Sequence, residues 1–183
     1  MTAAGTGPRV RTLEQARTFV LASRICTIFS RRRGIACLWD VVDLPDRQPG
    51  EPGWGQKIGH VWRWKNELPE QYPDEVFYGK IRGGHAALMA VEYLAQVHYP
   101  QNHLPVSACS HLARQLFVWI RAEPYTTGVL RREAIAGAGC TRQAFEKALR
   151  ELQTTLNIVR ANDPGLERDL WVPFSEQYPQ LGH

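Results

Sequence analysis

The chain has 183 residues and a mass of 20.8 kDa, which is enough for one or two domains. Its composition, 44% hydrophobic and 22% charged, indicates a packed core and excludes wholesale disorder. No apolar run reaches the ~18 residues of a membrane span, and no apolar segment of a secretory signal follows Met1. We therefore expect a cytoplasmic protein without membrane contact, whose four cysteines are reduced thiols.

The net charge of +4 is spread unevenly along the chain. Residues 1–33 hold seven arginines and one acidic residue, whereas the rest of the chain is close to neutral. The basic excess peaks at Arg31, Arg32 and Arg33. Such a cluster can attract phosphate, although a solvated surface turn is its more common role.

The N-terminal half predicts helices, short strands and long loops. Residues 1–11 are expected to be a flexible leader, and the capping box Thr12–Gln15 predicts a helix over 13–24. A short strand is expected over 26–29. Residues 40–75 hold five prolines and four glycines, which disfavour long helices, yet they also hold three tryptophans. We expect an ordered, loop-rich region whose aromatic rings pack on the body of the protein.

A domain boundary is expected after these loops. A strand is expected over 75–81 and a helix over 86–97, and then Pro100 and Pro105 interrupt the pattern. We therefore divide the chain into the leader, an N-terminal α+β region rich in Trp and Pro loops (12–105), and a C-terminal domain (106–183).

The C-terminal domain has the clearest pattern. Three amphipathic helices are expected, with N-caps at Ser107, Thr127 and Thr141. They precede a strand over 156–160, a turn, and a returning strand over 170–174 whose Pro173 indicates an edge strand. This order predicts a winged helix-turn-helix, so the fold class is α+β with the winged helix packed on the N-terminal region.

A third helix presented on the surface would fit the DNA major groove. Candidate contacts to bases or phosphates come from the second and third helices: Arg131, Arg132, Arg142, Gln143, Lys147 and Arg150. Acidic residues on the third helix reduce its positive charge, and winged helices also mediate protein contacts. A protein-interaction or dimerisation module therefore remains an alternative, and a homodimer is possible.

The segment from Trp62 to Lys65 alternates aromatic and basic residues. As a strand, it would place Trp62 and Trp64 on one side and Arg63 and Lys65 on the other. The aromatic rings could stack on bases while the cations neutralise phosphates. The alternative, which we favour, is that both tryptophans are core residues and both cations are solvated.

Three sequence motifs resemble the AlkZ/YcaQ-related group of winged-helix proteins, and its short members in particular. They are the third-helix pattern and the segments Trp62-Arg63-Trp64-Lys65-Asn66-Glu67-Leu68-Pro69 and Tyr78-Gly79-Lys80. The resemblance implies a grip on duplex DNA, and some members of the group are glycosylases that excise alkylated bases. The catalytic motif of those glycosylases, Gln-x-Gln or Gln-x-Asp, is absent from this sequence. The resemblance therefore implies the fold and a preference for nucleic acid, but it assigns no catalytic residue.

Other chemistry is weakly indicated. The histidines and cysteines lack metal-ligand spacing, and no phosphate-binding loop occurs, so we expect no metal and no cofactor. A divergent glycosylase would need a carboxylate beside a base pocket, for which only Asp40, Asp43 and Glu67 are candidates. Our leading hypothesis is a DNA-binding protein linked to repair or regulation, and we favour binding without enzymatic activity.

Overall fold

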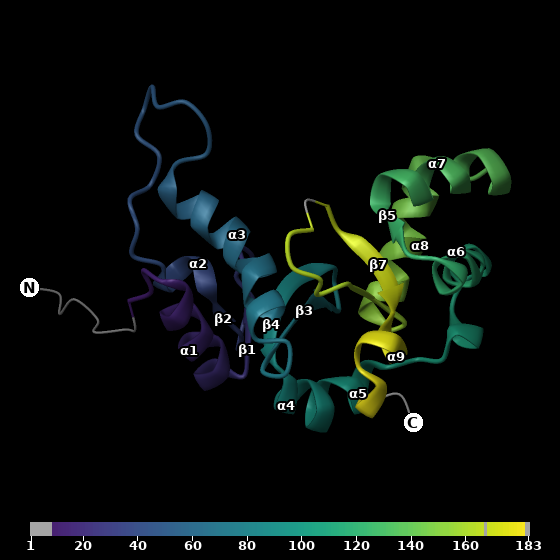
Figure 1. The fold of residues 1–183 in the computed structure, drawn as a ribbon, viewed down its shortest axis with the longest axis horizontal. Helices are drawn as coiled ribbons and strands as arrows, with labels where there is room; N and C mark the ends of the chain where they lie inside the picture. The colour runs from purple at the N-terminus through teal and green to yellow at the C-terminus, as the bar shows by residue number, and fades with distance from the viewer. Residues whose placement is uncertain (1–8, 167, 182–183) are drawn as a thin grey trace, which may run out of the picture.

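The computed structural model describes residues 9–166 and 168–181, in which helices and short strands are mixed along the chain (Figure 1). The first half contains α1 (Leu13–Ser23), β1 (Ile25–Thr27), β2 (Ala36–Cys37), α2 (Leu38–Val41), α3 (Gln56–Gln71), β3 (Val76–Ile81), β4 (His85–Ala90), α4 (Val91–Tyr93), a π-helical turn (Leu94–His98) and α5 (Tyr99–Asn102). After a 3₁₀ turn (Val106–Ala108), the second half contains α6 (His111–Ala122), β5 (Tyr125–Thr126), α7 (Thr127–Ala138), α8 (Arg142–Thr154), β6 (Ile158–Arg160), β7 (Leu170–Pro173), α9 (Phe174–Gln177) and a last 3₁₀ turn (Pro179–Leu181). The protein is an α+β protein, as predicted.

A four-stranded sheet organises the first half, in the order β2-β1-β4-β3. Strand β1 runs parallel to β2 and antiparallel to β4, and β3 and β4 form a hairpin. Helices α1 and α3 pack on the sheet, and the core between them contains Val20, Leu68 and Leu88. Since successive strand residues face opposite sides of a sheet, Phe77 and Met89 belong to a different core cluster.

The longer helices of the second half pack together with a three-stranded sheet. Helices α6, α7 and α8 share a core with β7, in which Leu116, Leu130, Phe145 and Trp171 are buried. The sheet has the order β5-β7-β6, with all neighbours antiparallel. The order of the three helices and of β6 and β7 is the predicted one, whereas the short strand β5 between α6 and α7 was not predicted.

The two halves share a third core cluster. Phe77 and Met89 of the first sheet lie in it with Phe174 and Tyr178 of the C-terminal segment. The Phe77 ring centroid lies 6.2 Å from that of Phe174 and 5.6 Å from that of Tyr178. Helix α8 and strand β6 also contact β3, so one side of α8 faces the first sheet. The division into domains at residue 105 remains a prediction.

Two predictions for the N-terminal half are wrong. Residues 56–71 form the long helix α3 rather than loops or an alternating strand. The prolines do not prevent this helix, because Pro45, Pro49 and Pro52 precede it and Pro69 lies in its last turn. Residues 86–97 begin as strand β4, because a short apolar run between two partner strands reads like a buried helix in sequence.

The predicted leader is shorter than residues 1–11. Val10 is buried and its backbone bonds to Val41 and Asp43, so it is fixed to the body. Residues 1–8 lie outside the described residues. Helix α1 begins as predicted, with Thr12 accepting a hydrogen bond from the Gln15 amide.

The C-terminal boundaries need smaller corrections. The caps of α6 and α7 are Ser110 and Thr126 rather than Ser107 and Thr127, whereas Thr141 caps α8 as predicted. Strand β7 is central rather than an edge strand. Pro173 is tolerated there because β5 pairs only with Leu170 and Trp171, at the other end of β7.

Candidate nucleic-acid interface and adjoining cleft

The β3–β4 turn brings together arginines from three distant segments. Arg82 is exposed within the turn, and Arg32 Nη1 lies 3.1 Å from Nε2 of His85 at its end. Gly84 has a φ of +80°, and a Cβ built there would lie 2.8 Å from Cδ of Arg150 on α8. We call Arg32, Arg82 and Arg150 the turn arginines; they join the basic N-terminal segment to α8.

Helix α8 exposes a polar face beside this turn. Gln143, Lys147 and Arg150 are all exposed and lie at the three-and-four spacing that places side chains on one helix face. The opposite face buries Phe145 against the core. Arg142 is exposed in the first turn, from which winged helices usually contact base edges.

Two of the predicted phosphate contacts are held by carboxylates. Arg31 makes a forked contact with Asp40, with Nη2 2.7 Å from Oδ1 and Nε 2.9 Å from Oδ2. Arg131 Nη1 lies 3.5 Å from Oε1 of Glu146 on α8. These ion pairs leave the two arginines less available to phosphate than the other candidates, of which Arg33, Arg63 and Arg132 are also exposed.

Lys65 is not on the surface. Because residues 61–71 are helical, Trp64 and Lys65 turn inward while Trp62 and Arg63 are exposed, which contradicts the predicted strand alternation. The spacing of Val61, Trp64, Lys65 and Leu68 is a helical signal that could have revealed this in the sequence.

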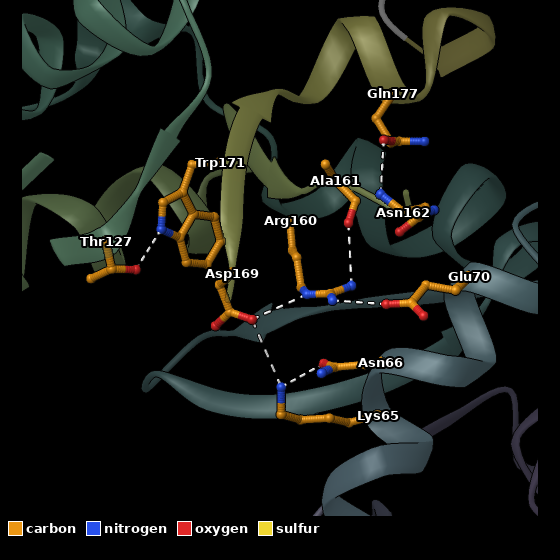
Figure 2. Close-up of polar contacts among 10 residues, drawn as sticks. All are labelled: Lys65, Asn66, Glu70, Thr127, Arg160, Ala161, Asn162, Asp169, Trp171 and Gln177. Carbon is orange, nitrogen blue, oxygen red and sulfur yellow. Dashed lines mark hydrogen bonds and ion pairs between the residues drawn. The ribbon is translucent and has the colours of Figure 1, made fainter. Parts of the chain in front are cut away.

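Lys65 belongs to an enclosed cluster of charges between α3 and β7 (Figure 2). Arg160, which is 2% exposed, donates to Oε1 of Glu70 at 2.8 Å and to Oδ1 of Asp169 at 3.1 Å. Lys65 Nζ donates to Oδ1 of Asn66 at 2.7 Å and lies 3.9 Å from Oδ1 of Asp169. The cluster links residues about one hundred positions apart, and the sequence reasoning missed it.

Two adjoining cavities of about 310 and 320 Å³ open beside this cluster. Both are lined by Trp62 and Lys65 of α3, Thr127 of α7 and Asp169 next to β7. Together they form what we call the cleft, which lies between the first sheet with α3 and the C-terminal helices. Its size is in the range of small-molecule sites.

Aromatic rings gather at the mouth of the cleft. Trp62 is 46% exposed, and its ring centroid lies 5.5 Å from that of Trp54 and 6.4 Å from that of Phe29. Trp54 and Phe29 are exposed as well. Flat, exposed rings of this kind can stack on unpaired bases or other planar groups.

Burial alters the proton affinities of the groups inside the cleft. Removal from water lowers the pKa of Lys65, with a further lowering by Arg160 that Asp169 opposes. Burial likewise lowers the pKa of Lys80 and raises the pKa of Tyr78 to about 12. The cleft therefore favours neutral forms of both its amines and its phenol.

The carboxylates that we considered for base excision are not arranged for it. The hydrogen bond from Arg31 lowers the pKa of Asp40, and the one from Arg11 lowers the pKa of Asp43, so both stay ionised in surface ion pairs. Glu67 is half-buried on α3. None of the three lines the two cavities that form the cleft.

Among residues 9–166 and 168–181, no three His, Cys, Asp or Glu side chains come close enough to hold a metal ion. The four cysteines are free thiols, and three are buried. No helix within the described part of the chain is long and apolar enough to cross a membrane.

Comparison with known proteins gives one match. No curated protein and no solved structure matches the chain. The sequence profile of the family described as "AlkZ related" matches residues 10–164, which covers α1 through the end of β6 and includes both the turn arginines and α8. The chain therefore belongs to the AlkZ-related family.

Proposed function

We propose that the protein binds duplex DNA through the exposed face of α8 and the turn arginines. In this proposal, residues 106–181 act as a winged helix, α8 lies in the major groove, and the wing and the β3–β4 turn flank it. Gln143 and Arg142 would contact base edges, and Lys147 would contact phosphate. Membership of a family related to AlkZ supports a role in DNA repair.

One observation carries the proposal. Arg32 and Arg150 come from different halves of the chain and lie against the adjacent residues Gly83 and Gly84, with Arg82 preceding them. Bringing the side chains of Arg32 and Arg150 to a turn that itself carries Arg82 raises the local positive charge, which a nearby anion would offset. A phosphate backbone supplies charges at the right spacing to be contacted by several arginines at once.

The proposal predicts a steep dependence of DNA affinity on salt. Affinity for a labelled duplex, measured by fluorescence anisotropy between 50 and 200 mM NaCl, should fall linearly in a double-logarithmic plot. Replacing all three turn arginines with glutamine should reduce the slope by about 3, since each lost phosphate contact reduces it by about 1.

A matched control removes the same charge elsewhere. Arg9, Arg114 and Arg121 are exposed, and their replacement with glutamine also lowers the net charge by three. This control should retain most of the salt slope. An equal loss in both triple variants would show that only net charge matters, and no binding by the wild type at 50 mM NaCl would refute the proposal.

A dimerisation module is the competing function. Val118 on α6 and Val129 and Ile135 on α7 are exposed apolar side chains, 53%, 36% and 44% accessible. Light scattering distinguishes the two functions: a stable homodimer that binds no duplex favours the interaction module, whereas a monomer that binds DNA favours the proposal.

A further inference from the structure

Lys65 is an unusually placed amine. It is one of four lysines in the chain, and its side chain is 5% exposed, yet it lines both cavities of the cleft. Its Nζ lies 4.7 Å from the centroid of the Trp62 ring and 5.0 Å from that of Tyr78. The ring faces attract the charged ammonium, whereas burial and Arg160 lower the pKa of the amine and so favour the neutral form that a nucleophilic lysine needs.

An ion-pair role accounts for Lys65 less well than for its neighbour. Arg160 makes the close hydrogen bonds to Glu70 and Asp169, whereas the amine of Lys65 is 3.9 Å from Asp169. Asn66, the next residue along the chain, accepts its one short hydrogen bond. At 3.9 Å, Asp169 can exchange a proton with the amine through one intervening water molecule, and no direct hydrogen bond from the amine to Asp169 holds it in its charged form.

The cleft also adjoins the proposed DNA interface. Glu146 and Leu149 of α8 line it, and Gln143 and Lys147 lie within one helical turn of Glu146 on the exposed side of the same helix. Lys80 lines it from β3, the strand that leads into the turn of Arg82. A group that leaves the duplex next to α8 could therefore enter the cleft.

We propose that Lys65 captures an aldehyde in this cleft by forming an imine, and that the aldehyde is the ring-opened sugar of an abasic site in DNA. This inference rests on the proposed function, because bound DNA would deliver the aldehyde. A sugar without its base is small enough for the cavities, and Trp62 at the mouth can stack in the space that the missing base leaves.

The reaction balances without an oxidant or reductant. The lone pair of the neutral amine attacks the C1 carbonyl carbon, and the carbonyl oxygen takes up a proton to give a carbinolamine. A second proton on that oxygen lets it leave as water while the nitrogen lone pair completes the C=N bond. The amine loses two protons and the departing water gains them, so Asp169 needs only to relay protons.

The experiment uses three labelled duplexes that differ at one position: an intact base, an abasic site, and a tetrahydrofuran analogue that has no aldehyde. Each is incubated with the full chain and cyanoborohydride, which reduces an imine to a stable secondary amine. The expected result is a covalent adduct on a denaturing gel with the abasic duplex alone. Peptide mass mapping should place it on Lys65, distinguishing it from the other lysines and the N-terminal amine.

Variants supply the controls. Lys65→Arg should lose the adduct at least tenfold while still shifting all three duplexes in a native gel. Lys57→Arg should trap as the wild type does, because Lys57 lies over the Trp39 ring outside the cleft. Mapping on the wild-type protein keeps the test valid even where Lys65→Arg fails to fold.

The possible failures are distinguishable. If no duplex binds at low salt, the proposed function fails. If the abasic duplex binds but yields no adduct, or if the adduct maps to another amine, the inference about Lys65 is overturned while DNA binding stands.

Discussion

The cations of this protein fall into two groups with opposite surroundings. The turn arginines and the cations of the α8 face are exposed to water, whereas Lys65 and Arg160 are enclosed between α3 and β7. Exposed cations retain their charge and are screened by salt, so they suit reversible contact with a polyanion. Enclosed cations must be compensated by protein groups, so their removal or titration acts on folding stability or on chemistry.

The largest expected effect comes from the enclosed group. Replacing Arg160 with alanine leaves Glu70 and Asp169 without their close partner and should lower the free energy of unfolding by about 3–5 kcal/mol. Urea unfolding followed by circular dichroism measures the loss. The matched variant Arg142→Ala removes an exposed arginine and should change stability by less than about 0.5 kcal/mol. Similar losses of stability in Arg160→Ala and Arg142→Ala would contradict the distinction between enclosed and exposed cations.

The next prediction distinguishes two consequences of replacing a turn glycine: backbone strain and displacement of an exposed arginine. Ala in place of Gly84 meets a φ of +80° and pushes against Arg150, so it should cost about 1–2 kcal/mol and reduce the salt slope of DNA binding by about 1. Gly50 has a φ of +89° but no neighbour within 4 Å among the described residues, so Gly50→Ala should cost similar stability and leave the slope unchanged. A slope that changes equally in both variants would contradict the role of Arg150.

The contrast between the groups should also appear in the pH dependence of stability. Because burial lowers the pKa of Lys65, the unfolded chain keeps its proton in a range where the folded chain has lost it. Stability should therefore rise with pH as it approaches the ordinary lysine pKa of ~10.4 from below. Tyr78 acts in the opposite direction above pH ~10, because its raised pKa favours the neutral phenol of the folded state.

Lys65→Met isolates the lysine contribution, since this variant retains Tyr78. Urea midpoints from pH 8 to 10 should rise in the wild type relative to Lys65→Met. Lys147→Met, which changes an exposed amine, should follow the wild-type curve. Parallel curves for wild type and Lys65→Met would mean that folding does not change the pKa of Lys65.

The sequence predicted the exposed group better than the enclosed one, for physical reasons. Helix α8 was predictable because a capping threonine and a strong amphipathic pattern both act within a few residues. Its exposed residues followed from the same pattern. The proximity of Arg32 to Arg150 was not predictable, because it depends on how the β3–β4 hairpin packs against α8.

The enclosed group was missed because two local signals were misleading. Clustered prolines suggested loops where α3 forms, so Lys65 was placed on a solvated strand face rather than on the inner face of a helix. The apolar run of β4 predicts a helix, so the sequence pattern does not reveal the sheet against which α3 packs. Without these elements, nothing in the sequence connects Lys65 with Asp169 or Glu70 with Arg160.

The smallest expected effect concerns an exposed ion pair. Asp40 is held by the forked contact of Arg31, both at the surface, and the hydrogen bond from Arg31 lowers the pKa of Asp40. A lowered carboxyl pKa adds stability above the ordinary value near ~3.9 that is lost as the pH falls through the folded value. Solvent screening keeps this contribution small.

Asp40→Asn should therefore lower the urea midpoint slightly at 20 mM NaCl and pH 7 and leave it unchanged at 0.5 M NaCl, where salt screens the pair. The same variant frees Arg31, which precedes Arg32 in the chain, so DNA affinity should increase and the salt slope should steepen by up to about 1. Unchanged affinity would show that Arg31 lies outside the contact surface and would limit the interface to α8 and the β3–β4 turn.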